Sequence, residues 1–340
     1  MHLRAMTTAL LVGVALAATP VLAQTAGNAG PAEVPATRDA PFTLPGKASA
    51  AAPLQIDSST LSRGPMALDP DAAAVSMGTE TLNKDGSVES KEASDAVRAF
   101  FQGTAGSETA TADRVVTGTD DRVQITDASG YPERIVGWLF SQAQDDSWST
   151  CSATLIGPYT VVTAAHCVFV HDKGGWIKDT VFLPGLTDPE SAPFGSFTWE
   201  NINILKGYIE NYDGTNYGSV VPWDLAVITL AEDAGNQLGW LGFRADDASK
   251  WAATAIGYPG DKPEGTMWKV NCDIAPEQFG DQLFFHTCDT FAGSSGSSMF
   301  EDAGGGDLYV RGINVAEDDK VNYGVRFIEP YYQFIIDNYK

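Results

Sequence analysis

Short runs of apolar and β-branched residues, broken by Gly, Pro, Asn and Asp, fill most of the chain after residue 114. Runs of this length and spacing are typical of an all-β barrel or sandwich, because alternating βαβ units would place helical patterns between the strands. Residues 330–340 carry four aromatic or aliphatic side chains on one helical face, which predicts a closing C-terminal helix. The predicted strands are 134–140, 152–156, 160–164, 224–230, 253–257, 267–270, 282–286, 308–315 and 323–328.

Residues 24–114 have a different pattern, rich in Ala, Pro, Ser and Thr, and all eight Trp and all eleven Tyr lie beyond residue 130. A segment without large aromatic side chains buries too little apolar surface to offset its ordering entropy, so we expect it to be largely flexible. Residues 90–103 are the exception. Their apolar side chains fall on one face and a glycine ends the run, which predicts a short amphipathic helix.

The first 23 residues have the pattern of a secretory signal peptide. Arg4 precedes an apolar run over residues 9–18, and Val21-Leu22-Ala23 resembles a cleavage site of small residues. The apolar run is too short to cross a bilayer. We therefore expect a secreted or periplasmic protein that has no membrane association once the signal is removed.

The charge of the chain excludes some classes of partner. The formal net charge is -23 at pH 7, and binding to nucleic acid or to an anionic membrane would work against long-range repulsion. We expect neither partner.

Four cysteines, Cys151, Cys167, Cys272 and Cys288, suit export to an oxidising compartment. They allow three disulfide pairings, of which pairing between sequence neighbours is the simplest. A metal site is the competing use, but no pair has the C-x-x-C spacing of common zinc sites.

The stretch CDTFAGSSGSSMF, residues 288–300, is either a serine-rich linker or a turn that presents a nucleophile. Glycines on both sides of Ser295 permit a tight turn and leave backbone N–H groups free to bind an oxyanion. The G-x-S-x-G nucleophile elbow is excluded because residue 297 is Ser.

A catalytic serine needs a base and a group that orients the base. Outside the signal peptide the only histidines are His166, His171 and His286. His166 ends a β-branched strand beside two alanines and a cysteine, whereas His171 reads as an exposed loop residue and His286 as a structural one. Asp224 opens an apolar strand, and a carboxylate there is either a turn residue or, if buried beside an imidazole, the group that fixes its tautomer.

Together, TAAHC (163–167), DLAVI (224–228) and GSSGS (293–297) resemble the chymotrypsin-like serine endopeptidases. Residues from 115 onward resemble the bacterial glutamyl endopeptidase branch more closely, in VVTGTDDRVQIT (115–126), LIGP (155–158) and GYPGDK (257–262). This resemblance implies two six-stranded antiparallel β-barrels with a C-terminal helix.

The resemblance also implies the roles of individual residues. His166 would be the general base, Asp224 its orienting carboxylate and Ser295 the nucleophile. The amides of Gly293 and Ser295 would form the oxyanion hole. Cys151 would pair with Cys167.

The substrate pocket is harder to predict. Thr290 and Val115 match the glutamyl branch, whose new N-terminal amine helps to neutralise the substrate carboxylate, but Asn314 stands where that branch usually has His. Asp289 stands six residues before Ser295, where trypsin-like enzymes bind Arg or Lys. Some glutamyl relatives also have Asp at this position, and the alternative role is a carboxylate that bonds the backbone at the base of the pocket. From Val115 onward, 13 Lys and Arg face 32 Asp and Glu, which disfavours acidic peptides.

The predicted organisation is a signal peptide (1–23), a prosegment (24–114) and a serine protease domain (115–340), with activation by a cut after Arg114. We expect a monomer that acts on protein or peptide substrates without a cofactor or metal. The first alternative is a catalytically inactive secreted binding protein of the same fold. The second is a zinc hydrolase using the three histidines, which lack the H-E-x-x-H spacing.

Overall fold

A computed structural model of the protein describes residues 48–52, 54–56, 70–104, 119–215, 217–245, 247, 249–318 and 320–340. The predicted signal peptide, Arg114 and Val115 lie outside the described residues.

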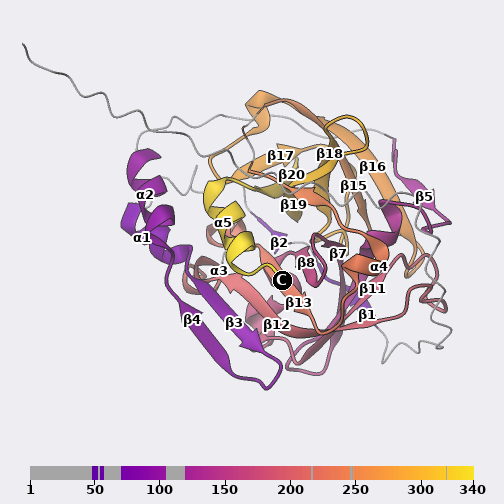
Figure 1. Ribbon diagram of the computed structural model, residues 1–340, viewed down its shortest axis with the longest axis horizontal. Helices are drawn as coiled ribbons and strands as arrows, with labels where there is room; N and C mark the ends of the chain where they lie inside the picture. The colour runs from indigo at the N-terminus through magenta and orange to yellow at the C-terminus, as the bar shows by residue number, and fades with distance from the viewer. Residues whose placement is uncertain are drawn as a thin grey trace, which may run out of the picture.

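Six antiparallel strands form a closed barrel in the first half of the protease-like region (Figure 1). Their order is β11-β6-β7-β8-β13-β12, and pairing of β11 with β12 closes the ring. The strands are β6 (Val136–Gln142), β7 (Trp148–Leu155), β8 (Thr160–Thr163), β11 (Asp179–Pro184), β12 (Phe197–Leu205) and β13 (Ala226–Leu230). β8 and β13 are buried along their whole length, and their threonines are buried together with the apolar residues.

A second, mainly antiparallel sheet follows, in the order β17-β20-β19-β18-β15-β16-β5. No hydrogen-bonded ladder joins β16 to β17 among the described residues, so the predicted second six-stranded barrel is present as an open sheet. A disulfide between Cys272 in β16 and Cys288, just beyond β17, ties these two strands together instead. The strands are β5 (Val123–Ile125), β15 (Trp251–Gly257), β16 (Met267–Ile274), β17 (Leu283–His286), β18 (Ser298–Asp302), β19 (Leu308–Glu317) and β20 (Asn322–Arg326).

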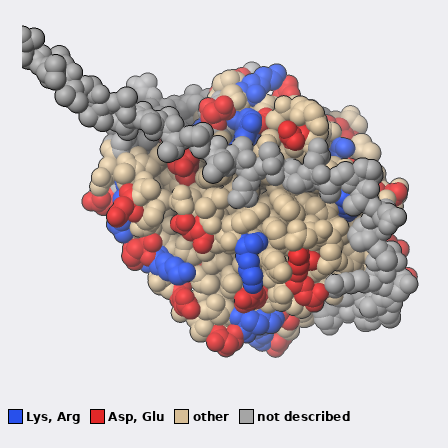
Figure 2. Space-filling view, viewed as in Figure 1, with Lys and Arg blue, Asp and Glu red and all other residues tan. Residues whose placement is uncertain are grey.

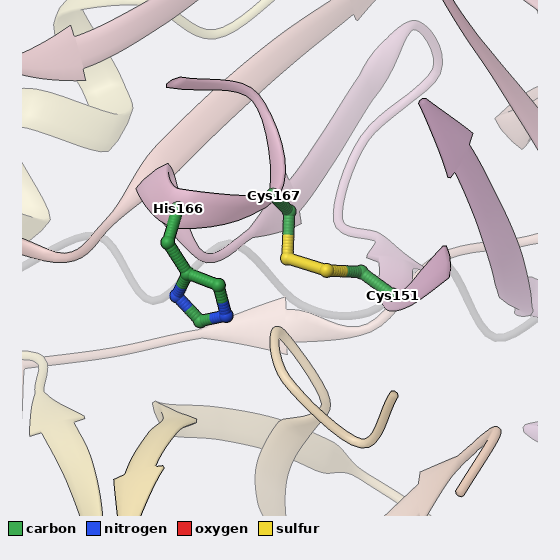
Figure 3. A group of neighbouring side chains, drawn as sticks. All are labelled: Cys151, His166 and Cys167. Atoms are coloured by element: carbon green, nitrogen blue, oxygen red, sulfur yellow. A yellow bond between two sulfur atoms is a disulfide. The ribbon is translucent and has the colours of Figure 1, made fainter. Parts of the chain in front are cut away.

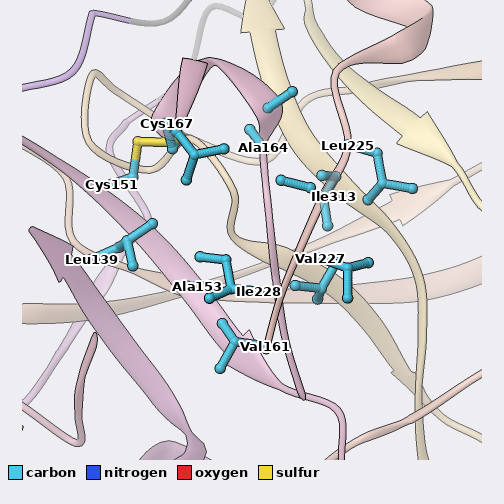
Figure 4. Packing of buried hydrophobic residues seen from close by; sticks show 14 of the residues in the cluster. Leu139, Cys151, Ala153, Val161, Ala164, Cys167, Leu225, Val227, Ile228 and Ile313 are labelled. Atoms are coloured by element: carbon cyan, nitrogen blue, oxygen red, sulfur yellow. A yellow bond between two sulfur atoms is a disulfide. The ribbon is translucent and has the colours of Figure 1, made fainter. Parts of the chain in front are cut away.

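The interior of the first barrel is packed with small and branched side chains from facing strands (Figure 4). Leu139, Ala153 and Val161 lie in one continuous cluster, and the Cys151–Cys167 disulfide borders it. The same cluster continues into the second sheet, where it includes Ile313, Val315 and Val325. A smaller separate cluster that includes Trp251, Phe284 and Met299 packs on another part of that sheet. The two halves of the protease-like region therefore share most of one apolar core.

Short elements complete this region. Tyr331, Phe334 and Ile335 of α5 are buried, so the predicted closing helix packs on the β-structure. No described helix has the length and apolar character needed to span a membrane. The remaining elements are β9 (Phe169–Val170), β10 (Gly175–Trp176), β14 (Gly242–Phe243), α3 (Lys206–Glu210), α4 (Gly235–Leu238) and α5 (Glu329–Asp337).

The composition predicts that residues 24–114 are largely flexible. This prediction is wrong for the parts of the range that the structure describes. These parts contain β1 (Ala48–Ala50), β2 (Leu54–Gln55), α1 (Pro70–Ser76), β3 (Thr79–Asn83), β4 (Val88–Lys91) and α2 (Asp95–Thr104).

The β3–β4 hairpin extends the first barrel because β3 pairs with β12, and α1 and α2 lie beside it (Figure 1). Ala73, Leu82, Val97 and Phe101 are buried in the main core. The composition argument fails because these residues pack on β12, α3 and α5 as well as on one another, and so join the main core. The helix predicted over 90–103 is α2, which begins at Asp95 because Ser90 and Lys91 belong to β4.

Candidate active site

Pairing of β8 with β13 brings His166 and Asp224 to the same end of the first barrel. The strands are antiparallel with Thr163 opposite Ala226, so the residues that follow β8 and those that precede β13 meet. His166 lies in a short 3-10 turn, Ala165–Cys167, and the disulfide to Cys151 leaves the same turn (Figure 3). The bridge therefore anchors the backbone of the histidine turn to β7.

The carboxylate of Asp224 is fully buried and holds His166 at two points. Oδ1 accepts a hydrogen bond from the backbone N–H of His166 at 2.9 Å, and Oδ2 lies 2.6 Å from Nδ1 of the ring. A carboxylate accepts from Nδ1–H, so this contact fixes the proton on Nδ1 and leaves Nε2 as the acceptor. The arrangement produces a ring whose free nitrogen can take a proton.

Ser295 lies in a turn between β17 and β18. The turn requires a glycine on each side of the serine. Gly293 and Gly296 have φ values of +92° and +81°. A Cβ on Gly296 would lie 2.1 Å from Oγ1 of Thr163, and one on Gly293 would lie 2.5 Å from the carbonyl oxygen of Tyr258. The glycines that flank the serine therefore supply both the backbone conformation and the close approach to neighbouring chain segments.

The serine turn is held by the first barrel, mainly through Ser152 of β7. The N–H of Ser152 donates to the carbonyl of Ser295 at 2.8 Å, and its hydroxyl donates to the carbonyl of Gly293 at 2.9 Å. The same hydroxyl accepts a hydrogen bond from the N–H of Tyr258. Sequence analysis missed Ser152, because a serine inside a β-strand carries no local signal of such a role.

The three predicted segments therefore converge. Sγ of Cys167 lies 3.9 Å from the carbonyl oxygen of Ser295, and Gly296 packs against Thr163 and Ala164, which precede the histidine. Both Nε2 of His166 and Oγ of Ser295 are buried, and neither has a hydrogen-bond partner in the described part of the chain. The segments that carry the base and the hydroxyl are therefore in contact, and the two groups are not hydrogen bonded in this conformation.

The predicted pocket residues lie beside the serine turn. Asn314, in β19, is buried and donates through Nδ2 to the carbonyl of Ser294 at 3.3 Å. Its Oδ1 lies 3.0 Å from Nε2 of His286, whose pKa burial lowers to about 4. His286 is thus the structural residue that the sequence predicts, but it directly supports a residue of the predicted pocket.

Asp289 and Thr290 are half-buried next to this turn, and a second acidic residue faces Asp289. The backbone N–H of Asp121 donates to Oδ2 of Asp289 at 3.0 Å. Burial, and then the charge of Asp289, raise the pKa of Asp121. The neighbouring Arg122 pairs with Asp120 and Asp261, so its charge is already neutralised.

The prediction of an exposed loop residue at His171 is wrong. Its ring stacks on Tyr212 with centroids 4.0 Å apart, and Nε2 lies 3.0 Å from the carbonyl oxygen of Tyr208. Burial lowers its pKa. His171 and His166 line one cavity of about 500 Å³, together with Phe169, Tyr208 and, unexpectedly, residues 49–52, 54 and 55 of the predicted prosegment.

Two groups of side chains in the described residues bring a histidine near two cysteines, and both include a disulfide. They are Cys151, His166 and Cys167, and Cys272, His286 and Cys288. Zinc binds cysteine as a thiolate, and a sulfur held in a disulfide cannot supply one. These groups therefore do not form the donor set of a Cys–His zinc site.

Comparison with known proteins agrees with this geometry. Residues 151–306 match the family model of the trypsin-like peptidase domain. The matched part contains the histidine–aspartate pair and the serine turn, and it is similar to a trypsin-like peptidase domain. The closed antiparallel barrel that carries the pair begins before it, at β6.

Two curated proteins and one solved structure are similar to a larger part of the chain. The chain is 33% identical over 188 residues to the glutamyl endopeptidase of Bacillus licheniformis, covering 55% of this chain and 54% of that protein. It is 31% identical over 220 residues to the extracellular metalloprotease of Bacillus subtilis, covering 60% and 66%. A solved structure of a Glu endopeptidase in complex with MPD matches with a TM-score of 0.56 and 25% identity, covering 66% and 99%. The chain spans between half and two thirds of the curated relatives it matches.

Proposed function

We propose that the protein is a serine endopeptidase that hydrolyses peptide bonds through an acyl-enzyme. The observation that carries this proposal is the double contact of buried Asp224 with His166, beside the turn that presents Ser295. A residue serving only as a strand start would have no need of a fully buried charge directed at an imidazole.

The proposed reaction assigns one role to each group. Oγ of Ser295 attacks the substrate carbonyl carbon while Nε2 of His166 takes the hydroxyl proton, and Asp224 stabilises the resulting imidazolium. The proton then passes to the leaving amine as the C–N bond breaks, and water hydrolyses the ester by the same sequence. The amides of Gly293 and Ser295 are the proposed donors to the oxyanion, and removing one such donor costs about 3 to 4 kcal/mol in comparable sites.

A phosphonofluoridate probe tests this proposal. We expect the secreted protein to be modified once, at Ser295, without effect of chelators, and the Ser295→Ala variant to remain unmodified. Ser297→Ala is the matched control, because it changes a hydroxyl in the same turn, and it should still react at Ser295. Failure of the folded, secreted protein to react would favour the inactive binding protein, and chelator-sensitive hydrolysis would favour a zinc hydrolase.

For specificity, we propose a basic or broad preference for the residue before the scissile bond. Asp289 faces a second carboxyl, Asp121, and the nearby Arg122 is paired with two aspartates. His286 is held neutral near pH 7 behind Asn314, so it offers no charge to a substrate carboxylate. On the face shown in Figure 2, acidic side chains are spread over the described surface.

Peptide profiling distinguishes this preference from the one in the names of several relatives. A panel of chromogenic peptides that differ only in the residue before the cut should favour Lys or Arg, or show little selection. Preference for Glu by tenfold or more would reject the proposal. Asp289→Asn should reduce cleavage after Lys and Arg, while Asp273→Asn, on exposed surface of the same sheet, should leave it unchanged.

We also propose that the chain is exported and made as a zymogen, with a signal peptide (1–23), a prosegment (24–114) and a protease domain (115–340). The two disulfides support an oxidising destination. Secreted active protein should begin at Val115 by N-terminal sequencing. Full activity with residues 24–114 still attached would contradict the zymogen.

A further inference from the structure

Residues 48–52 and 54–56 of the predicted prosegment connect the first barrel to the second sheet. Ala48–Ala50 pair with Trp148–Thr150 of β7, and Leu54 and Gln55 pair with Ala316 and Glu317 of β19. Main-chain hydrogen bonds extend both ladders, from Ala51 N–H to Thr150 at 2.9 Å and from Ile56 N–H to Glu317 at 3.2 Å.

Between its two paired ends, the segment forms a hydrogen bond with a backbone amide that the proposed mechanism needs. The carbonyl oxygen of Ala51 accepts a hydrogen bond from the N–H of Gly293 at 3.1 Å. Gly293 is the proposed oxyanion donor, so its amide cannot bind a substrate oxygen while Ala51 is in place. The segment also borders the cavity that His166 lines.

The direction of the segment is opposite to that of a productive substrate. The pocket for the residue before the scissile bond lies on the second sheet, at Asp289 and Asn314, whereas the proton for the leaving amine comes from His166 on the first barrel. A substrate therefore places its N-terminal half on the second sheet and its C-terminal half toward the first barrel. Residues 48–50 lie on the first barrel and residues 54–56 on the second sheet, and both pairings are parallel.

We propose that the segment formed by residues 48–52 and 54–56 is a built-in inhibitor that binds the substrate cleft in reverse and so blocks it without being cut. This inference rests on the proposed function and identifies how the same site is kept inactive. In the reversed direction the amine that would leave after Ala51 lies on the side of the second sheet, away from His166. A carbonyl can thus occupy the oxyanion donor while no group is placed to protonate the nitrogen.

The inhibitory segment has mostly small side chains, as expected of a segment that binds the cleft only until it is removed. Residues 49–52 are Ser and Ala, which leave the neighbouring cavity of about 500 Å³ unfilled. The affinity then comes from main-chain hydrogen bonds and from two buried side chains, Leu54 and Ile56. Ala50 makes the tightest approach, because a Cβ built on Gly260 would lie 2.3 Å from the Cβ of Ala50.

Disulfide trapping in the full chain tests the direction without depending on catalysis. In a Ser295→Ala background, Ser49→Cys with Ser149→Cys, and Gln55→Cys with Glu317→Cys, should cross-link on oxidation, because these pairs are opposite each other in the sheet. When the partners are exchanged, 49 with 317 and 55 with 149, the yield of cross-linked protein should be at least tenfold lower. Equal or greater yield from the exchanged pairs, or no cross-link from the first pairs, would overturn the proposal.

The reactivity of Ser295 tests the inhibition. In the uncut full chain, verified by intact mass, Ala50→Leu should collide with Gly260, displace the segment and raise the rate of phosphonofluoridate modification at least tenfold. Ser90→Leu is the matched control, because Ser90 is an exposed serine of β4 that does not line the cavity, and its rate should stay within twofold of the wild type. An Ala50→Leu variant that reacts no faster than the wild type would refute inhibition.

The two tests separate failure of the inhibitor from failure of the enzyme. If the wild type, Ala50→Leu and the processed protein all fail to react, the proposed function is wrong, while the cross-links still decide how residues 48–56 lie. If the processed protein reacts but Ala50→Leu gives no gain, the function stands and the inhibitor does not.

Discussion

The two halves of the protease-like region are closed in different ways. Hydrogen bonds between β11 and β12 complete the first barrel, whereas in the described part of the second sheet no ladder joins β16 to β17, and the Cys272–Cys288 disulfide links them. The first barrel carries His166 and Asp224 at the end of one strand pair, and the second sheet carries Ser295 in a turn. Ser152 of the first barrel holds this turn by two hydrogen bonds, so the first barrel helps to position the groups of both halves.

The largest expected effect comes from the charge that orients His166. Asp224→Asn should lower kcat by about 10⁴-fold, because the amide stabilises the wrong tautomer of the imidazole. Rates on a chromogenic peptide, with unfolding curves to verify the fold, provide the measurement. Glu210→Gln, an exposed acid at the end of α3, is the control and should stay within twofold. More than a tenth of the wild-type rate in Asp224→Asn would remove that residue from the proposed triad.

Removing each disulfide in turn tests whether the first barrel and the second sheet depend differently on their disulfides. Both bridges span a sequence separation of 16, so the chain-entropy contribution is the same, about 3 kcal/mol each. We expect Cys272→Ala with Cys288→Ala to increase hydrogen exchange throughout β16 and β17, because no ladder holds these strands together. The same change at Cys151 and Cys167 should leave the strands of the first barrel protected. Equal loss of protection in both halves would show that closure by hydrogen bonds gives no advantage.

Acid should destabilise the second sheet through His286. Its pKa is about 4 in the folded protein and near 6.5 when unfolded, so the unfolded chain binds more protons between these values and stability falls as the pH drops from 6.5 to 4. The loss is on the order of 3 kcal/mol when complete. His286→Gln should lose less stability over this range in urea unfolding experiments. Identical slopes in the wild type and the variant would contradict this prediction.

The smallest expected effect tests the link between the halves. Ser152→Ala removes the hydroxyl that bonds the carbonyl of Gly293 and should reduce kcat by about tenfold, since each 1.4 kcal/mol in the barrier is a factor of ten. KM should change little, because the hydroxyl bonds the serine turn rather than the pocket residues. Ser149→Ala on the same strand is the control. A change confined to KM would contradict a positioning role.

Features that depend on local sequence were predictable. The motifs around His166, Asp224 and Ser295 each combine a short strand or turn with a chemical group, and the structure brings their segments together. Both disulfides join sequence neighbours, the simplest of the possible pairings. All nine predicted strands have counterparts, although β7 and β16 extend several residues beyond the predicted ranges.

Features that depend on partners distant in the sequence were not predictable. β18 was missed because its first residue belongs to the serine-rich turn by composition, and β11 and β12 because their polar positions obscure the alternation. Apart from α2, the ordered parts of the predicted prosegment were missed for the same reason. Their apolar residues are too few for a core of their own and suffice only against β12 and the cleft. Ser152 gave no signal, because its role comes from the loop that packs against it.

The hairpin that β3 and β4 add to β12 has a consequence for the life of the protein after the proposed cut. Residues 201–205 use β3 as a neighbour, and the buried Lys206 uses Glu92 as its counter-ion, at 2.6 Å. A processed chain that lost these contacts would keep a fold that formed while the hairpin was still attached. Its durability in the extracellular environment would then be set by the height of the barrier to unfolding, and a molecule that crossed it once would not return.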